Sequence, residues 1–188
     1  WPETSLELVD QFIGHGPRRL LLDVFREIGH PIDDASIDRA HQAYLNNYRA
    51  APAARTRLFP NVREDLAELV AAGLDLGICT NKPHELTLQV LDILGLTPLF
   101  KAAVGADAVP ASKPDPGHLL EVARRMDLDE QNWVYVGDTV VDQKTAERAG
   151  ATFFAVPWGG GPALDLPASH RLRRLSDLLP TGKRQALI

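Results

Sequence analysis

Residues 133–150 read W-V-Y-V-G-D-T-V-V-D-Q-K-T-A-E-R-A-G, a pattern that predicts a strand, an acidic turn and a helix. Residues 133–136 are a short aromatic and β-branched run that ends at Gly137, as expected of a buried parallel strand. The helix is predicted over 142–149, because Gly150 suits the left-handed position that follows a helix. This unit is typical of an α/β fold.

The acidic turn brings two carboxylates to the end of that strand. Asp138 and Asp142 stand four residues apart where the strand gives way to the helix, so both can face one small volume. Ligands of open α/β sheets bind at the carboxyl ends of the strands, and paired carboxylates there suit a hard cation such as Mg²⁺. The alternative is that both side chains only cap the helix. The turn alone leaves these two interpretations open.

Composition places the chain among ordinary globular proteins of one or two domains. It has 188 residues, of which 45% are hydrophobic and 24% charged. The net charge of -5 argues against a general nucleic-acid binder. Cys79 is the only cysteine, which excludes an internal disulfide framework and fits a reducing compartment. No apolar run has membrane-spanning length, so we expect no membrane partner and a cytoplasmic location.

Residues 1–57 are predicted to form a small all-helical domain that ends in a linker over 50–57. A G-H-G turn between the first two predicted helices can bring His15 and Arg18 toward a ligand. The alternative is a plain interhelical turn with a solvated histidine.

Residues 58–188 alternate between predicted helices and strands. A capping-box-like pair, Asn61 with Glu64, predicts a helix over 61–72. Besides 133–136, strands are predicted over 74–79, 100–104 and 152–156, with a final short helix in the tail. Alternation with short connections predicts a mostly parallel sheet flanked by helices.

Polar residues follow three of these segments. Thr80 and Asn81 come after the strand over 74–79, Lys113 precedes a helix, and the third set is the acidic turn. Each has a structural alternative, either a helix cap or a surface lysine. Together they suit a single chemistry, because a hydroxyl and an amide donate to phosphoryl oxygens, a lysine neutralises charge, and carboxylates hold Mg²⁺. The set predicts a phosphoryl-transfer site that lacks only a nucleophile.

The motifs I-C-T-N-K-P (78–83), S-K-P-D-P (112–116), V-G-D-T-V-V-D (136–142) and V-P-W-G (156–159) occur in this order. In them the chain resembles the haloacid dehalogenase superfamily, specifically its phosphoglycolate-phosphatase-like members. The resemblance implies a Rossmann-like parallel sheet core over 58–188 and a helical cap over 1–57. It also implies that F-I-G-H-G (12–16) is the cap loop that faces the substrate.

The resemblance implies a mechanism and a role for each site residue. An aspartate would attack a phosphomonoester, with 2-phosphoglycolate as the expected substrate, and water would hydrolyse the aspartyl phosphate. Thr80 and Asn81 would bind and orient the phosphoryl group, and Lys113 would stabilise its charge. Asp138 would ligate Mg²⁺, and Asp142 would support the metal shell or Lys113. His15 and Arg18 would be the cap residues that read a substrate carboxylate.

The chain departs from the family at its first motif, D-x-D-G-T, which is absent. Asp23 lies within an apolar helical pattern and Asp33 at a helix start, so neither replaces the nucleophile. The family's central first strand is expected upstream of Trp1, and without it the strand edges at the middle of the sheet are expected to be unpaired. We therefore interpret the sequence as the remainder of a longer enzyme.

Other functions fit parts of the motif set. A catalytically silent fragment or pseudoenzyme that binds phosphate or a partner fits the missing motif, and a sugar-phosphate phosphatase or mutase fits the remaining ones. A phosphonate hydrolase would need a cap lysine, but no lysine precedes Lys82. A dehalogenase would not need the paired aspartates. The oligomeric state is not predicted by any feature of the sequence.

Overall fold

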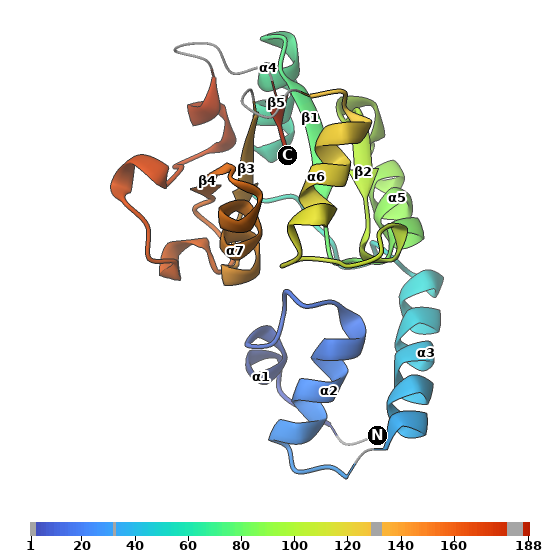
Figure 1. Ribbon diagram of the computed structural model, residues 1–188. Helices are drawn as coiled ribbons and strands as arrows, with labels where there is room; N and C mark the ends of the chain where they lie inside the picture. The colour runs from blue at the N-terminus through green and yellow to red at the C-terminus, as the bar shows by residue number, and fades with distance from the viewer. Residues whose placement is uncertain (1–2, 32, 129–132, 180–185) are drawn as a thin grey trace. The chain divides into compact units, whose positions relative to one another are not determined.

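The computed structural model describes residues 3–31, 33–128, 133–179 and 186–188 (Figure 1). The chain divides into two compact units, one up to Ala54 and the other from Arg55 onward. Each unit has its own hydrophobic core.

The first unit is helical in its described residues. Its helices are α1 (Leu6–Asp10), α2 (Pro17–Glu27) and α3 (Asp34–Ala50). Pro17 opens α2, where a missing N–H is tolerated, and Asp33 caps α3 by accepting a hydrogen bond from the Ser36 N–H at 2.7 Å. Helices α2 and α3 pack through Phe25, Ile37 and Ala40, which form a small core.

The second unit is a parallel sheet with helices on both faces. Its longer helices are α4 (Val62–Ala71), α5 (His84–Ile93), α6 (Pro116–Arg125) and α7 (Val140–Ala149). Its strands are β1 (Asp75–Cys79), β2 (Ala102–Val104), β3 (Trp133–Gly137), β4 (Thr152–Ala155) and β5 (Ala186–Leu187). The sheet order in the described residues is β2-β1-β5-β3-β4, and every pairing is parallel.

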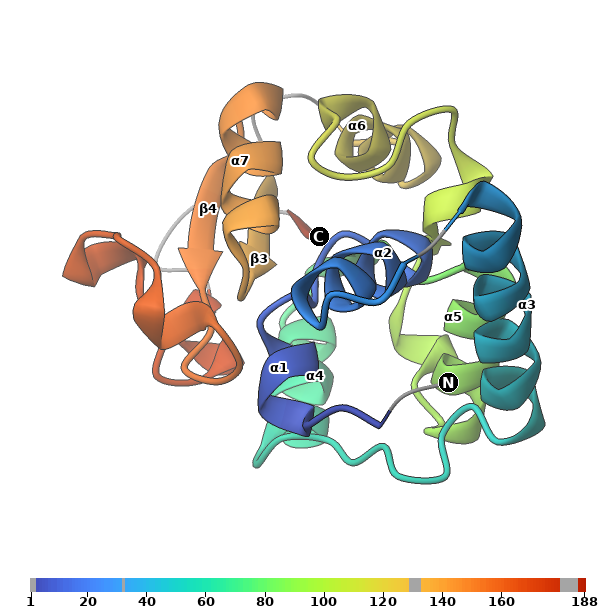
Figure 2. The same ribbon diagram turned by 90° about the horizontal axis from the view of Figure 1, so that it is seen from below.

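Alternation along the strands produces two cores, one on each face of the sheet. In β3, Trp133 and Tyr135 face the core beneath α6 and α7, whereas Val134 faces the core beneath α4 and α5. Figures 1 and 2 show α6 and α7 together on one side of the strands, and α4 lies on the other. The predicted α/β fold with a mostly parallel sheet is therefore confirmed.

The middle of the sheet differs from the expectation. We expected unpaired strand edges there, but β5 pairs with both β1 and β3: Leu187 is level with Leu76 and with Val134. Ile188 continues the pairing, because its N–H donates to the Val134 carbonyl at 3.0 Å. The prediction missed this strand because two residues carry no periodicity. Ala186, Leu187 and Ile188 are all buried, and their side chains enter the cores on the two faces of the sheet, which explains why an apolar A-L-I run fits there.

The predicted capping box at the start of α4 is wrong. Asn61 adopts a left-handed backbone (φ 63°), and its side chain makes no capping hydrogen bond. The fixed acidic group of the first turn is instead Asp65, which is 0% exposed. Its carboxylate accepts hydrogen bonds from the Arg174 guanidinium and, at 2.9 Å, from the Leu175 N–H. Asp65 thus fastens the C-terminal segment to α4.

We expect Arg174→Met to lower the free energy of unfolding by about 2–3 kcal/mol, because it leaves the Asp65 carboxylate buried with less compensation. This value is below that of a fully buried pair, since the Arg174 side chain is 43% exposed. Burial raises the pKa of Asp65, but the hydrogen bonds from Arg174 and the backbone outweigh it and the net pKa is lowered. The stabilisation is therefore present above the unfolded-state pKa and lost as pH falls through the lower folded-state pKa.

Urea unfolding at pH 7, and again toward about pH 3, below the unfolded-state pKa of an aspartate, measures this effect. The matched control is Arg173→Met, because Arg173 is 91% exposed in its pair with Asp177 and should contribute little. Equal losses for the two variants, or a difference that grows as the pH falls, would contradict the role given to Asp65.

Candidate functional site at the carboxyl edge of the sheet

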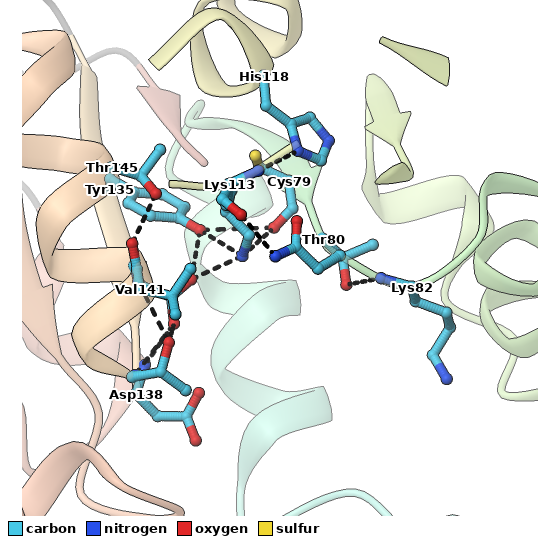
Figure 3. A network of polar contacts seen from close by, with 12 residues as sticks. Cys79, Thr80, Lys82, Lys113, His118, Tyr135, Asp138, Val141 and Thr145 are labelled. Atoms are coloured by element: carbon cyan, nitrogen blue, oxygen red, sulfur yellow. Dashed lines mark hydrogen bonds and ion pairs between the residues drawn. The ribbon is translucent and has the colours of Figure 1, made fainter. Parts of the chain in front are cut away.

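The predicted polar residues of the second unit lie at the carboxyl edge of the sheet (Figure 3). Thr80 directly follows β1 and Asp138 directly follows β3, while Lys113 lies in the segment that leads into α6. Parallel strands end at the same edge, so side chains distant in sequence come together there.

Lys113 is the centre of the cluster. Its ammonium donates to the Cys79 carbonyl at 3.0 Å, to the Tyr135 hydroxyl at 2.9 Å and to Asp142 Oδ1 at 2.6 Å. The side chains of Lys113 and Asp142 are only 9% and 7% exposed. The surface-lysine alternative is therefore excluded, and Lys113 links the end of β1 to β3 and α7.

Asp142 uses both carboxylate oxygens within the protein. Oδ1 accepts from Lys113 and Tyr135, while Oδ2 accepts from the Thr139 N–H at 3.0 Å and its hydroxyl at 2.6 Å. Thr139 in turn caps α7, so the pair forms a capping box. Burial raises the pKa of Asp142, but the charge of Lys113 and the hydrogen bonds outweigh it and the net pKa is lowered. Asp142 is thus an ionised helix cap and also the partner of Lys113.

Tyr135 belongs to the site although the sequence pattern did not single it out. Its hydroxyl donates to Asp142 Oδ1 at 2.8 Å, and the residue is 2% exposed. Burial, followed by the charge of Asp142, raises its pKa well above the ordinary value. The available signal was a tyrosine two positions before Gly137 in a buried strand, because a buried phenol needs a polar partner.

His118 and Asn81 hold the backbone of Lys113. The Lys113 N–H donates to Nδ1 of His118 at 3.3 Å, so the proton on the ring is on Nε2, which lies 3.0 Å from the Val104 carbonyl. Asn81 Nδ2 donates to the Lys113 carbonyl at 2.9 Å. Burial lowers the pKa of His118, which favours this neutral form. Sequence reasoning missed His118, whose role depends on contacts far along the chain.

Thr80 and Asp138 are half-buried at the mouth of the cluster. Thr80 Oγ1 accepts from the Lys82 N–H at 3.2 Å, and α5 begins after Pro83 without a side-chain cap. Capping of α5 by Thr80 is therefore not observed. Asp138 Oδ2 accepts from the Gly160 N–H at 3.3 Å, and burial, aided by the charge of Asp142, raises the pKa of Asp138.

The donor set fits Mg²⁺ held largely by water and substrate. Across the described ranges, no three His, Cys, Asp or Glu residues gather closely enough to hold a metal ion. Mg²⁺ commonly uses one or two carboxylates and completes its shell with waters and phosphate oxygens. Asp138 is suited to be that carboxylate, whereas both oxygens of Asp142 are already engaged by Lys113, Tyr135 and Thr139.

His15 and Arg18 belong to the first unit, and both are exposed. His15 lies in the turn between Gly14 and Gly16, and Arg18 pairs with Asp38 at 3.0 Å. Their role in reading a substrate stays a prediction.

Cys79 provides a probe of the cluster, and we expect its thiol to be inert in the folded protein. Burial raises its pKa to about 12, with a smaller contribution from the charge of Asp142, so the reactive thiolate is scarce at neutral pH. Labelling with iodoacetamide at pH 8 should be slow until urea unfolds the chain. Because Cys79 is the only cysteine, total incorporation by mass spectrometry measures it directly. Equal labelling rates with and without urea would contradict the burial of this strand end.

Comparison with known proteins identifies the family of this chain. The family model described as haloacid dehalogenase-like hydrolase matches residues 2–156. A phosphoglycolate phosphatase from Cereibacter sphaeroides is 36% identical over 185 residues, covering 97% of this chain and 84% of that protein. One from Caulobacter vibrioides is 35% identical over 158 residues, covering 84% and 67%.

Solved structures show the same fold. A crystal structure described as a predicted phosphoglycolate phosphatase from Haemophilus somnus has a TM-score of 0.81 at 24% identity, covering 95% of this chain and 82% of that one. β-Phosphoglucomutase from Clostridium difficile has a TM-score of 0.74 at 15% identity, covering 94% and 78%.

A parallel sheet with a buried lysine and carboxylates at its carboxyl edge defines an open α/β protein of the Rossmann-like kind, whose ligand site lies at that edge. The chain belongs to the haloacid dehalogenase-like hydrolase family, and within it to the phosphoric monoester hydrolases that resemble phosphoglycolate phosphatase. The family and enzyme class predicted from the motifs are confirmed. Among the described residues, no helix has the length and apolar character needed to cross a membrane.

Proposed function

We propose that this protein hydrolyses a small phosphomonoester in a Mg²⁺-dependent reaction, with 2-phosphoglycolate as the substrate. The observation that carries the proposal is the buried Lys113–Asp142 pair, with Nζ and Oδ1 2.6 Å apart, at the carboxyl edge of the sheet. A desolvated lysine beside Thr80 and Asp138 is suited to a phosphoryl group. The two relatives described above are phosphoglycolate phosphatases, which supports the substrate.

Each residue has a role in this proposal. Thr80 donates its hydroxyl proton to a phosphoryl oxygen, and Asn81 fixes the Lys113 loop. An ammonium has three donors, and the three acceptors of Lys113 account for them, so Lys113 acts on the phosphoryl group chiefly through its charge. Asp138 would hold Mg²⁺, which supplies charge neutralisation on the phosphoryl oxygens when bound. His15 and Arg18 would read the substrate carboxylate.

The proposed reaction passes through an aspartyl phosphate, whose nucleophile we place outside this sequence. The pairing register supports a position for it. Leu187 is level with Leu76 and Val134, so an extended chain three positions further on is level with Cys79 and Gly137. That level is one residue before Thr80 and Asp138, the next residues along the two strands. An attacking carboxylate is best placed there, at the carboxyl end of the β5 position.

Adding a D-x-D-G-T strand tests this placement. Joined after Ile188, the segment continues β5, whereas joined before Trp1 it must take the place of β5. We call either product the completed chain. Mg²⁺-dependent release of phosphate from 2-phosphoglycolate by a completed chain supports the proposal, and the productive junction shows how the central position is filled. Binding of phosphate without turnover by both products would favour a silent binding protein instead.

A substrate panel separates the remaining alternative. Glucose 1-phosphate and other sugar phosphates should be hydrolysed at least tenfold less efficiently than 2-phosphoglycolate by the completed chain. A preference for a sugar phosphate would favour the sugar-phosphate phosphatase or mutase. The similarity of this chain to β-phosphoglucomutase is one of fold, and fold alone does not predict the substrate.

A further inference from the structure

The V-P-W-G motif continues into two more glycines and has no role in the function proposed above. Its loop, residues 156–162, follows β4 and lies against the turn that carries Asp138. The contact is direct, because the Gly160 N–H donates to Asp138 Oδ2 at 3.3 Å.

The loop approaches Asp138 so closely that a side chain on Gly159 would displace the Asp138 carboxylate and one on Gly160 would meet the Asp138 backbone. A Cβ atom on Gly159 would lie 2.1 Å from Asp138 Oδ2, and one on Gly160 would lie 2.6 Å from the Asp138 carbonyl oxygen. Gly159 has φ +58°, but Gly160 has φ -79°, which any residue adopts. Conformation therefore does not explain the glycine at position 160, whereas the approach to Asp138 does.

Both ends of the loop are fixed to the second unit. Trp158 stacks on Phe59, with ring centroids 5.0 Å apart and an interplanar angle of 12°. On the other side, Arg171 Nη1 donates to the carbonyls of Gly161 and Pro162 at 3.4 and 3.2 Å. These contacts fix the position of the loop backbone next to the Asp138 carboxylate.

We infer that Gly159 and Gly160 are positioning residues that clamp the Asp138 carboxylate for cation binding. The N–H of Gly160 fixes Oδ2, the absence of a side chain on Gly159 leaves room for that oxygen, and Oδ1 is the oxygen that meets the cation. This inference rests on the proposed function, in which Asp138 holds Mg²⁺. It assigns a second element of the fold, the loop after β4, to the metal site.

Three variants and one matched control test the clamp, with Mg²⁺ alone as the probe in isothermal titration calorimetry. Gly160→Ala and Gly159→Ala should each weaken Mg²⁺ binding at least tenfold. Asparagine tolerates the left-handed backbone at position 159, but its Cβ would still meet Asp138. Gly159→Asn should therefore bind Mg²⁺ no more tightly than Gly159→Ala. Gly73→Ala is the control, because Gly73 has φ +84° and nothing within 4 Å of its Cβ position. It should bind Mg²⁺ as the unaltered protein does.

A second readout requires no metal. The amide proton of Gly160 in the Mg²⁺-free protein should move in the NMR spectrum on Asp138→Ala, since its acceptor is removed. An unmoved Gly160 amide, unchanged affinity in Gly160→Ala, or full affinity in Gly159→Asn would overturn the clamp. If the unaltered protein does not bind Mg²⁺, the proposed metal site fails, and the amide resonance alone decides whether the loop holds Asp138.

Discussion

Lys113→Met should remove about 3–5 kcal/mol from the free energy of unfolding, because Asp142 is left as a buried charge without its partner. In the completed chain, kcat should also fall roughly 10²–10³-fold, since a preorganised charge beside the phosphoryl group is lost. Urea unfolding of the chain as it stands and steady-state kinetics of the completed chain measure the two effects. Few single substitutions in this protein should be as damaging.

An exposed ion pair between a lysine and an aspartate provides the control for Lys113. Lys101 pairs with Asp75 at 2.5 Å, but its side chain is 57% exposed, so Lys101→Met should change stability by less than about 1 kcal/mol. The double variant Lys113→Met, Asp142→Asn removes both buried charges and should recover part of the stability without recovering turnover. A small stability loss in Lys113→Met, equal to that of the control, would contradict a buried ion pair.

Asp138→Asn should abolish Mg²⁺-dependent turnover of the completed chain, by roughly 10³-fold or more, while leaving the fold intact. Burial raises the pKa of Asp138, so its charged form is disfavoured in the folded protein without metal. As pH rises above the unfolded-state pKa, this carboxylate therefore lowers stability, and Asn should be neutral or slightly stabilising at pH 7. Loss of function with unchanged or increased stability is the expected signature of a site residue.

Asp115→Asn is the matched control for that substitution. Asp115 caps α6 by accepting from the Gly117 N–H at 2.8 Å, and asparagine caps equally well. Turnover should be unchanged in this variant. Full activity in Asp138→Asn would instead remove Asp138 from the proposed metal site.

The stretch around Asp138 could be predicted because its signals are local. An apolar strand, a turn and a capped helix follow one another within residues 133–150, and α7 begins at Val140, two residues before the expected start. The place of Lys113 in the site was predictable only from the resemblance of its motif to the family. Its burial depends on contacts with Cys79 and Asp142, 34 and 29 residues away, which no local pattern encodes.

The residues that were missed share the same physical cause. Tyr135 and His118 belong to no recognisable motif in the sequence, and their polar atoms find partners only when β3 and α6 are packed. The β5 strand was missed because strand position depends on the empty place it fills between β1 and β3. Tertiary context, not propensity, decided these three features. The roles of the cap residues and the cytoplasmic location stay predictions.

Release of phosphate from 2-phosphoglycolate, with and without Mg²⁺, tests the central claim most directly. It should be measured on protein whose intact mass has been checked, for the chain as it stands and for the completed chain. We predict no release by the chain alone and Mg²⁺-dependent release by the completed chain. Release by the chain alone would contradict our placement of the nucleophile outside this sequence, because the nucleophile would then lie among residues to which we gave no catalytic role.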